Sequence, residues 1–100
     1  MPISGDLRAG DALVAAEFGT VLVEAETRLA DVQAVERKSR LKQRDLGADR
    51  LILLLAETPH NHRVVELHPE LHARYPIGTR KCLAMLGRGL DPGGDCLIFL

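Results

Sequence analysis

Aromatic residues and cysteines are scarce in this chain of 100 residues, and each scarcity excludes a class of function. The aromatic residues are Phe18, Tyr75 and Phe99, and tryptophan is absent. Proteins that hold single-stranded nucleic acid without sequence preference stack its bases on several aromatic side chains, so we do not expect that mode of binding. Cys82 and Cys96 are the only cysteines. Two thiols in such a chain are more often buried apolar groups than a disulfide.

The chain also lacks a net charge and a long apolar run. Its 13 Lys and Arg nearly balance its 14 Asp and Glu, so a signal for nucleic acid or a membrane surface must be local. No apolar segment approaches the roughly 20 residues that cross a bilayer. The N-terminal MPISGDLRAG has neither the charged nor the apolar region of a signal peptide. We therefore expect a cytoplasmic protein with no membrane partner.

What is present is enough for one core, since 46% of the residues are hydrophobic, and we expect residues 1–100 to form a single domain. Periodicity and turn residues predict elements in the order β-β-α-β-α-α-β. They comprise strands over 11–18 and 20–26, a helix over 28–46, a strand over 50–58, a helix from Pro59 that is interrupted near Pro69, a helix over 80–89 and a strand over 96–100. Thr58 is the expected N-cap of the helix from Pro59, and Thr79 that of the helix over 80–89. The long helix permits a right-handed parallel crossover. The expected class is α/β, with a small mixed sheet in which a β-hairpin is joined by a parallel strand.

Three carboxylates gather on the predicted hairpin. Residues on a strand alternate between faces, so Glu24 and Glu26 project from the same face. If the chain reverses at 18–19, Glu26 lies opposite Asp11 and Glu24 lies opposite Leu13, which puts the three carboxylates on one surface. A slip of one residue would move Asp11 to the other face.

Two interpretations of these carboxylates stay open. Like charges held closely repel one another, and proteins usually tolerate them where a cation or a proton is shared. Mg²⁺ and Mn²⁺ take oxygen ligands, often one or two carboxylates together with phosphate oxygens, so Asp11 and Glu24 are the predicted metal ligands. The alternative is a solvent-facing sheet surface with ordinary acidic residues.

The helix over 28–46 carries a polar stripe between two apolar stripes. Thr27 is the expected N-cap and Gly47 the expected C-cap. The stripe is spaced by four, three and four residues: Gln33, Arg37, Arg40 and Arg44. It indicates either a solvated helix face or the lining of a cleft beside the carboxylate hairpin, where it would bind phosphate groups.

The order of these parts resembles the core of the PD-(D/E)XK nuclease-like superfamily, which has a restriction-endonuclease-like fold. The similar parts are Asp11 on one strand, VEAET on the next, a helix with Gln33 and basic residues, and then an apolar strand. In more detail, GDLRAGDALV, VLVEAETRLADVQ, LKQRD, LILLLAET and DPGGDCLIFL resemble the C-terminal region of actinobacterial helix-turn-helix regulators of the XRE type.

The nuclease resemblance implies a role for each site residue. Asp11 matches the first metal-binding Asp and Glu24 the acidic residue of the second motif, with Mg²⁺ or Mn²⁺ as cofactor. Glu26 stands where Lys is usual, and a carboxylate cannot stabilise developing negative charge. Glu26 would instead act as general base, or Arg37 or Lys42 would supply the missing cation. The resemblance also implies that Gln33, Arg37, Arg40 and Arg44 contact DNA near the scissile phosphate.

Two functions follow, and the sequence leaves the choice open. One is a metal-dependent nuclease or its degenerate descendant, and the other is a non-catalytic accessory domain for self-association or sensing. We see no helix-turn-helix segment before Pro2, and the superfamily's leading helix and first strand are missing or reduced. A fragment, an alternative start or a shortened paralogue would each explain this. A truncated sheet has an open edge, which favours a homodimer.

Overall fold

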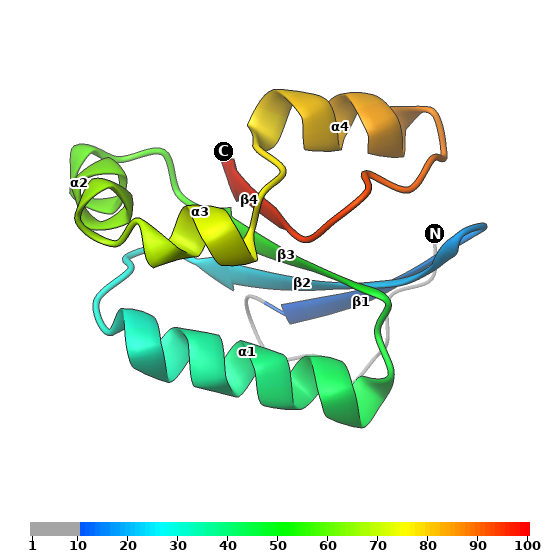
Figure 1. The fold of residues 1–100 in the computed structure, drawn as a ribbon, viewed down its shortest axis with the longest axis horizontal. Coiled ribbons are helices and arrows are strands. Elements are labelled where there is room, and N and C mark those ends of the chain that lie inside the picture. The colour runs from blue at the N-terminus through cyan, green and yellow to red at the C-terminus, as the bar shows by residue number, and fades with distance from the viewer. Residues whose placement is uncertain (1–10) are drawn as a thin grey trace.

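A four-stranded sheet with helices on both faces makes up the computed structural model, which describes residues 11–100 (Figure 1). The elements are β1 (Asp11–Ala16), β2 (Gly19–Glu26), α1 (Val32–Leu46), β3 (Arg50–Leu55), α2 (Pro59–Leu67), α3 (Glu70–Arg74), α4 (Thr79–Gly87) and β4 (Cys96–Phe99). The expected order holds with one addition. The helix predicted to be interrupted near Pro69 is two separate helices, α2 and α3, because a proline cannot continue a helix from its interior.

The sheet is mixed and its strands follow one another in the order β1-β2-β3-β4. β1 and β2 form the antiparallel hairpin, and β3 and β4 each add in parallel. The predicted α/β class and the parallel crossover through α1 are therefore confirmed. Helices α1, α2 and α3 cover one face of the sheet and α4 covers the other (Figure 1). Within residues 11–100, no helix is long and apolar enough to cross a membrane.

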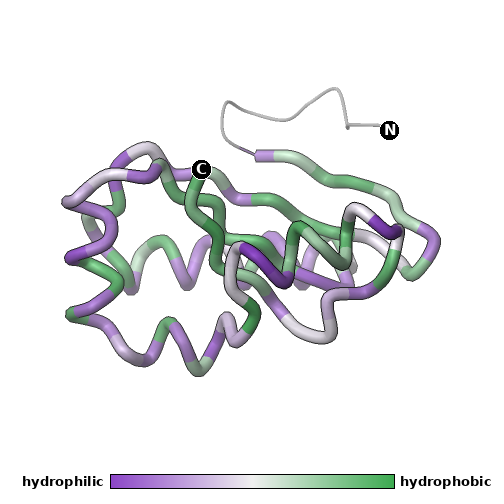
Figure 2. Tube along the Cα trace, turned by 90° about the horizontal axis from the view of Figure 1, so that it is seen from above, coloured by the Kyte–Doolittle hydropathy of each residue, from purple (hydrophilic) through white to green (hydrophobic). Residues whose placement is uncertain are grey.

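β3 is buried on both faces, as its uninterrupted apolar run predicts. Leu51, Leu53 and Leu55 pack with residues of α1, α2 and α3, whereas Ile52 packs with α4 and β4. Figure 2 shows hydrophobic residues running along the strands and hydrophilic residues recurring along the helices. The two thiols, on α4 and β4, are free and fully buried in the second cluster, so the prediction of buried cysteines is confirmed.

The hairpin register differs from the predicted one by two residues. Ala16 pairs with Gly19, so the chain reverses at residues 17–18, and Asp11 lies opposite Glu24 rather than Glu26. Gly19 has φ +145°, and a Cβ there would overlap the Asp49 carboxylate. Glycine is therefore needed as the first residue of β2, beside Asp49, and not in the turn. A shift of two residues preserves the faces, so the three carboxylates still share one surface.

Helix α1 begins later than predicted, and Thr27 is not its cap. Asp31 is the N-cap, and its Oδ1 accepts a hydrogen bond of 3.0 Å from the Ala34 amide. The segment before it is held by Asn61 of α2, which accepts from the Leu29 amide at 2.8 Å and donates to the Thr27 carbonyl at 3.0 Å. These bonds fix residues 27–30 as a loop.

Of the other predicted helix caps, two are confirmed and one is wrong. Gly47 is the left-handed C-cap of α1 and Thr58 is the N-cap of α2, as predicted. Thr79 is not the cap of α4, because Gly78 takes that position. The Thr79 hydroxyl instead accepts a 3.0 Å hydrogen bond from the Phe99 amide, which joins α4 to β4.

Asn61→Ala is expected to destabilise the protein by about 2 to 4 kcal/mol. Asn61 is fully buried, and its removal leaves the Leu29 amide and the Thr27 carbonyl without a hydrogen-bond partner, while the Ala56 carbonyl keeps the Thr58 amide. Urea denaturation followed by circular dichroism measures the loss. Arg63→Ala, an exposed change on the same helix, is the control and should cost less than about 0.5 kcal/mol. Equal stability of the two variants would show that Asn61 does not hold this loop.

Candidate functional site

Asp11, Glu24 and Lys42 meet beneath α1. Asp11 and Glu24 lie directly opposite each other on β1 and β2. Lys42 of α1 reaches down to both: its Nζ hydrogen-bonds to Asp11 Oδ2 and lies 3.1 Å from Glu24 Oε1. The side chains of Lys42 and Asp11 are 33% and 12% exposed, whereas that of Glu24 is 1% exposed. We call these three residues the carboxylate–lysine triad.

The alternation of β2 explains why a glutamate is buried here. Glu24 lies on the same face as Leu22, which is fully buried under α1. On β3 its neighbour is Leu53, which is also in the core. Glu24 thus lies in line with buried apolar residues, and its carboxylate contacts Asp11 and Lys42 instead of water.

Burial and charge set the protonation of the triad. Burial raises the pKa of Glu24 to about 7, and a hydrogen bond with Asp11 and its charge act in the same direction. Burial acts against ionisation of Asp11 as well, but hydrogen bonds from Glu24 and Lys42 outweigh it and lower the Asp11 pKa. Burial opposes the charge of Lys42, yet its bonds to the two carboxylates raise the Lys42 pKa. Near neutral pH the triad therefore exchanges one proton at Glu24.

Glu26 lies on the same face but pairs elsewhere. Its Oε1 is 3.7 Å from Nζ of Lys38, and the two side chains are 23% and 53% exposed. Lys38 and Lys42 are four residues apart on α1, so both point to the hairpin from one side of the helix. Sequence reasoning proposed Lys42 and missed Lys38, although the four-residue spacing of the two lysines was the available signal.

The triad supplies two carboxylates for a hard cation such as Mg²⁺, but not a full set of protein ligands. Among residues 11–100, no group of three or more His, Cys, Asp or Glu side chains is placed to hold a metal ion. Mg²⁺, however, is commonly bound by one or two carboxylates while water and phosphate oxygens complete its shell. Within the same residues, Glu24 Oε1 is buried and accepts no hydrogen bond, and its neighbouring charge is Lys42 Nζ at 3.1 Å. Asp11 and Glu24 thus supply the usual protein share of such a site, with one oxygen unsatisfied.

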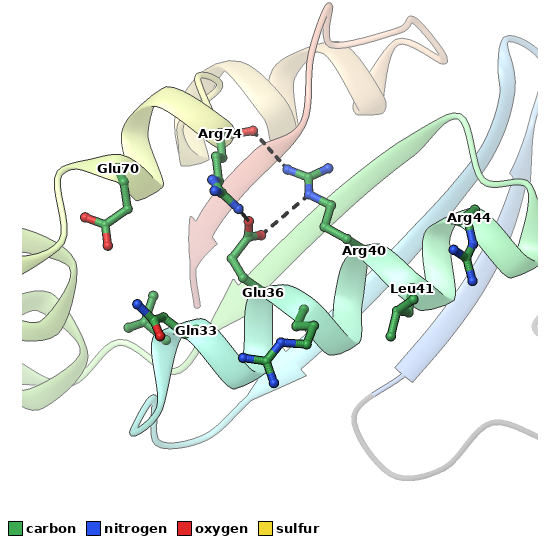
Figure 3. Close-up of a pocket in the computed structure, with 9 residues that line it drawn as sticks. Gln33, Glu36, Arg40, Leu41, Arg44, Glu70 and Arg74 are labelled. Carbon is green, nitrogen blue, oxygen red and sulfur yellow. Dashed lines mark hydrogen bonds and ion pairs between the residues drawn. The ribbon is translucent and has the colours of Figure 1, made fainter.

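The predicted polar stripe lines a groove, but not the groove expected. A cavity of about 620 Å³ lies between α1 and α3. Its lining consists of Val32, Gln33, Glu36, Arg37, Arg40, Leu41, Arg44, Glu70 and Arg74 (Figure 3). The buried residues of α1 are Val32, Glu36 and Ser39, and they separate this side of the helix from the side that carries Lys42. The stripe therefore faces α3 and not the carboxylate hairpin, so Arg37 and Lys42 do not converge.

Glu36 organises the floor of this groove, and sequence reasoning gave it no role. It is 6% exposed, and its Oε2 accepts a 2.6 Å hydrogen bond from Arg74. Its Oε1 accepts a hydrogen bond from the Tyr75 hydroxyl and lies 3.6 Å from Arg40 Nε. Burial and the Glu36 charge raise the pKa of Tyr75, which remains a neutral donor. The partners lie 38 and 39 residues along the chain, so no local pattern reveals this network.

The guanidinium of Arg40 hydrogen-bonds to other parts of the fold. Its Nη1 donates to Asp95 at 2.5 Å and to Gln43 at 2.9 Å, and its Nη2 donates to the Arg74 carbonyl at 3.3 Å. Its guanidinium also lies 5.0 Å from the centre of the Tyr75 ring. Arg40 thus joins α1 to the end of α3 and to the segment before β4.

Comparison with protein-family models, with curated proteins and with solved structures finds no match for this chain. The likeness to nucleases and to helix-turn-helix regulators therefore stays a resemblance of residues and motifs. The α/β class is what the structure itself establishes.

Glu24→Gln is expected to gain stability relative to the unmodified protein as the pH rises from 5 to 8. An unfolded glutamate ionises near 4.5, whereas folded Glu24 does so near 7, so the folded state binds more protons between these values and loses stability as the pH increases. Gln removes this loss, which is on the order of 1 to 3 kcal/mol. Urea denaturation at both pH values measures the difference.

Leu22→Val is the control for this experiment. It perturbs a buried neighbour on the same face of β2 without changing a titratable group, and should cost about 1 kcal/mol at either pH. If the two variants show the same pH dependence, the raised pKa of Glu24 is refuted.

Proposed function

We propose that this chain is a PD-(D/E)XK-type nuclease-like domain that hydrolyses phosphodiesters with Mg²⁺ or Mn²⁺. The observation that carries the proposal is the contact of Lys42 with both Asp11 and Glu24. In the resembling family a lysine follows the acidic residue on the same strand, where this chain has Glu26. A helix-borne Lys42 offers the same combination of two carboxylates and one ammonium group from a different element.

Each residue of the triad has a stated task in this reaction. Asp11 and Glu24 would hold the metal, which when bound polarises the phosphate and lowers the pKa of water. Water attacks phosphorus, a new P–O bond forms, and the bond to the leaving sugar oxygen breaks as that oxygen takes up a proton. Lys42 stabilises the negative charge that develops on the phosphate oxygens. Glu26, which is partly exposed on the same face, accepts the proton of the attacking water.

Gln33, Arg37, Arg40 and Arg44 take no part in this chemistry. They line the groove on the far side of α1 from the triad, and the buried stripe of the helix lies between the two. This placement revises the expectation that they contact the scissile phosphate. It also leaves Lys42 as the cation that compensates for Glu26.

A second candidate is a non-catalytic accessory domain for self-association or sensing. The observation that favours it is the closure of the triad: Glu24 is 1% exposed, and Lys42 already lies against both carboxylates. In this case the triad is an ion cluster that holds α1 on the hairpin. Of the four described strands, β1 has a strand neighbour on one side only, whereas the outer edge of β4 donates hydrogen bonds to Ile77 and Thr79, so β1 is the strand edge that favours association.

Incubation of the purified protein with plasmid and single-stranded DNA in the presence of Mn²⁺ separates the two candidates. The nuclease proposal predicts cleavage that Glu24→Ala abolishes and that Lys42→Met reduces by about 10² to 10³-fold, because a charge-stabilising donor is lost. Lys81→Met is the control: it removes an exposed lysine on α4, on the other face of the sheet, and should retain cleavage. Circular dichroism confirms that each variant is folded.

Thermal unfolding with and without Mn²⁺ completes the test. A bound metal raises the melting temperature of the unmodified protein, and Glu24→Ala removes the rise. Absence of cleavage together with an unchanged melting temperature contradicts the nuclease and leaves the accessory domain.

A further inference from the structure

The groove between α1 and α3 is separate from the triad. Its volume of about 620 Å³ lies in the range of pockets that hold small molecules. Its lining contains four arginines, two glutamates, one glutamine and two apolar residues. Since it opens on the other side of α1 from Lys42, an occupant need not be a substrate of the triad.

The arginines of the groove differ in whether a carboxylate neutralises them. Arg40 and Arg74 are paired with Asp95 and Glu36 in the floor. Among residues 11–100, Arg37 has no carboxylate partner, and Arg44 is paired only with the adjacent Asp45 at 3.2 Å, where both side chains are more than two-thirds exposed. Exposed pairs of this kind are weak. Arg37 and Arg44 are therefore available to bind an anion.

Glu70, the remaining acidic residue of the lining, does not neutralise this pair. Figure 3 shows Glu70 on α3 near Gln33, whereas Arg44 lies at the opposite end of the groove. Its Oε2 is 2.9 Å from His68 Nδ1, a residue outside the groove. Arg44 thus lies at the end of the groove away from Glu70, and Arg37, one turn after Gln33 on α1, has no ion pair with Glu70 within the described residues.

The spacing of the two arginines limits the shape of an occupant. They are seven residues apart on α1, which places their Cα atoms about 10 Å apart along the helix axis. Leu41 lies between them in the lining and is 45% exposed. The ring of Tyr75 is covered by Arg40 and buried, so the groove offers no aromatic surface for a nucleobase.

We propose that this groove binds a small molecule with two acidic groups, phosphates or carboxylates, joined by an aliphatic segment. Arg37 and Arg44 each take one acidic group, by paired hydrogen bonds of the kind that guanidinium groups form with carboxylates and phosphates. Leu41 packs on the aliphatic segment. The floor of Glu36, Arg40 and Arg74 is fixed by its own ion pairs, so little of the groove has to be ordered when the molecule binds.

Titration of the ¹⁵N-labelled protein with defined probes tests this proposal. The probes are suberate, a linear eight-carbon dicarboxylate, hexane-1,6-diyl bisphosphate, and inorganic phosphate. Saturable shifts are expected for amides of residues 33–44 and of α3. Inorganic phosphate should bind at least about tenfold more weakly than the better of the two linked probes, since it reaches one arginine only. The tighter linked probe identifies the class of acid.

Arg37→Gln/Arg44→Gln is expected to weaken binding of the better probe at least about tenfold. The matched control is Arg63→Gln/Arg80→Gln, which removes two exposed arginines on α2 and α4, outside the groove, and should bind as the unmodified protein does.

Three outcomes overturn the proposal. One is equal weakening by the two double variants, which indicates non-specific attraction to positive charge. Another is the absence of saturable shifts with both linked probes. The third is tighter binding of a short DNA duplex than of either linked probe at the same amides, because the groove would then be a nucleic-acid surface.

Discussion

The burial of Glu24 under α1 is the constraint on which the rest of the structure depends. A lone ionised carboxylate in an apolar core is costly, and proteins avoid that cost with a counter-charge or a proton. This molecule uses both: Lys42 lies against the carboxylate, and the pKa is raised to about 7. Because Lys42 must reach Asp11 and Glu24 together, α1 has to lie over the hairpin. The ion cluster thereby fixes the position of the helix that separates the two candidate sites.

Helix α1 presents a different chemistry on each of three sides. Lys38 and Lys42 meet the carboxylates of the hairpin. Val32, Glu36 and Ser39 are buried against the sheet and α3. The arginine stripe lines the groove on the remaining side. A chain with almost no net charge thus concentrates opposite charges in two places, and the apolar core between them keeps those places apart.

Features that depend on neighbouring residues were predictable from the sequence. The buried strand β3, the left-handed Gly47 and the Thr58 cap each rest on a pattern of a few residues, and all three are as expected. The mixed sheet followed from the length of the helix that joins β2 to β3. The predicted register was wrong by two residues, but Asp11 and Glu24 still share a face as predicted, because the side-chain period of a strand is two.

Features that depend on distant partners were not predictable. Gly19 begins β2 because Asp49, 30 residues later, occupies the space beside it. Helix α1 starts at Val32 because Asn61 holds the preceding loop from 32 residues away. The side of α1 that Arg37 faces is set by the position of α3. Amphipathic periodicity shows which residues share a helix face, but not which element that face meets.

The ionisation of Glu24 in the unmodified protein and in Lys42→Met tests the central claim most directly. Carbon-13 NMR of the Glu24 side-chain carboxyl, followed as a function of pH, reports its pKa. We expect a midpoint near 7 in the unmodified protein and a higher midpoint in the variant, because loss of the ammonium group disfavours the carboxylate. A midpoint near the ordinary 4.5, unmoved by the loss of Lys42, would contradict a buried carboxylate held by that lysine.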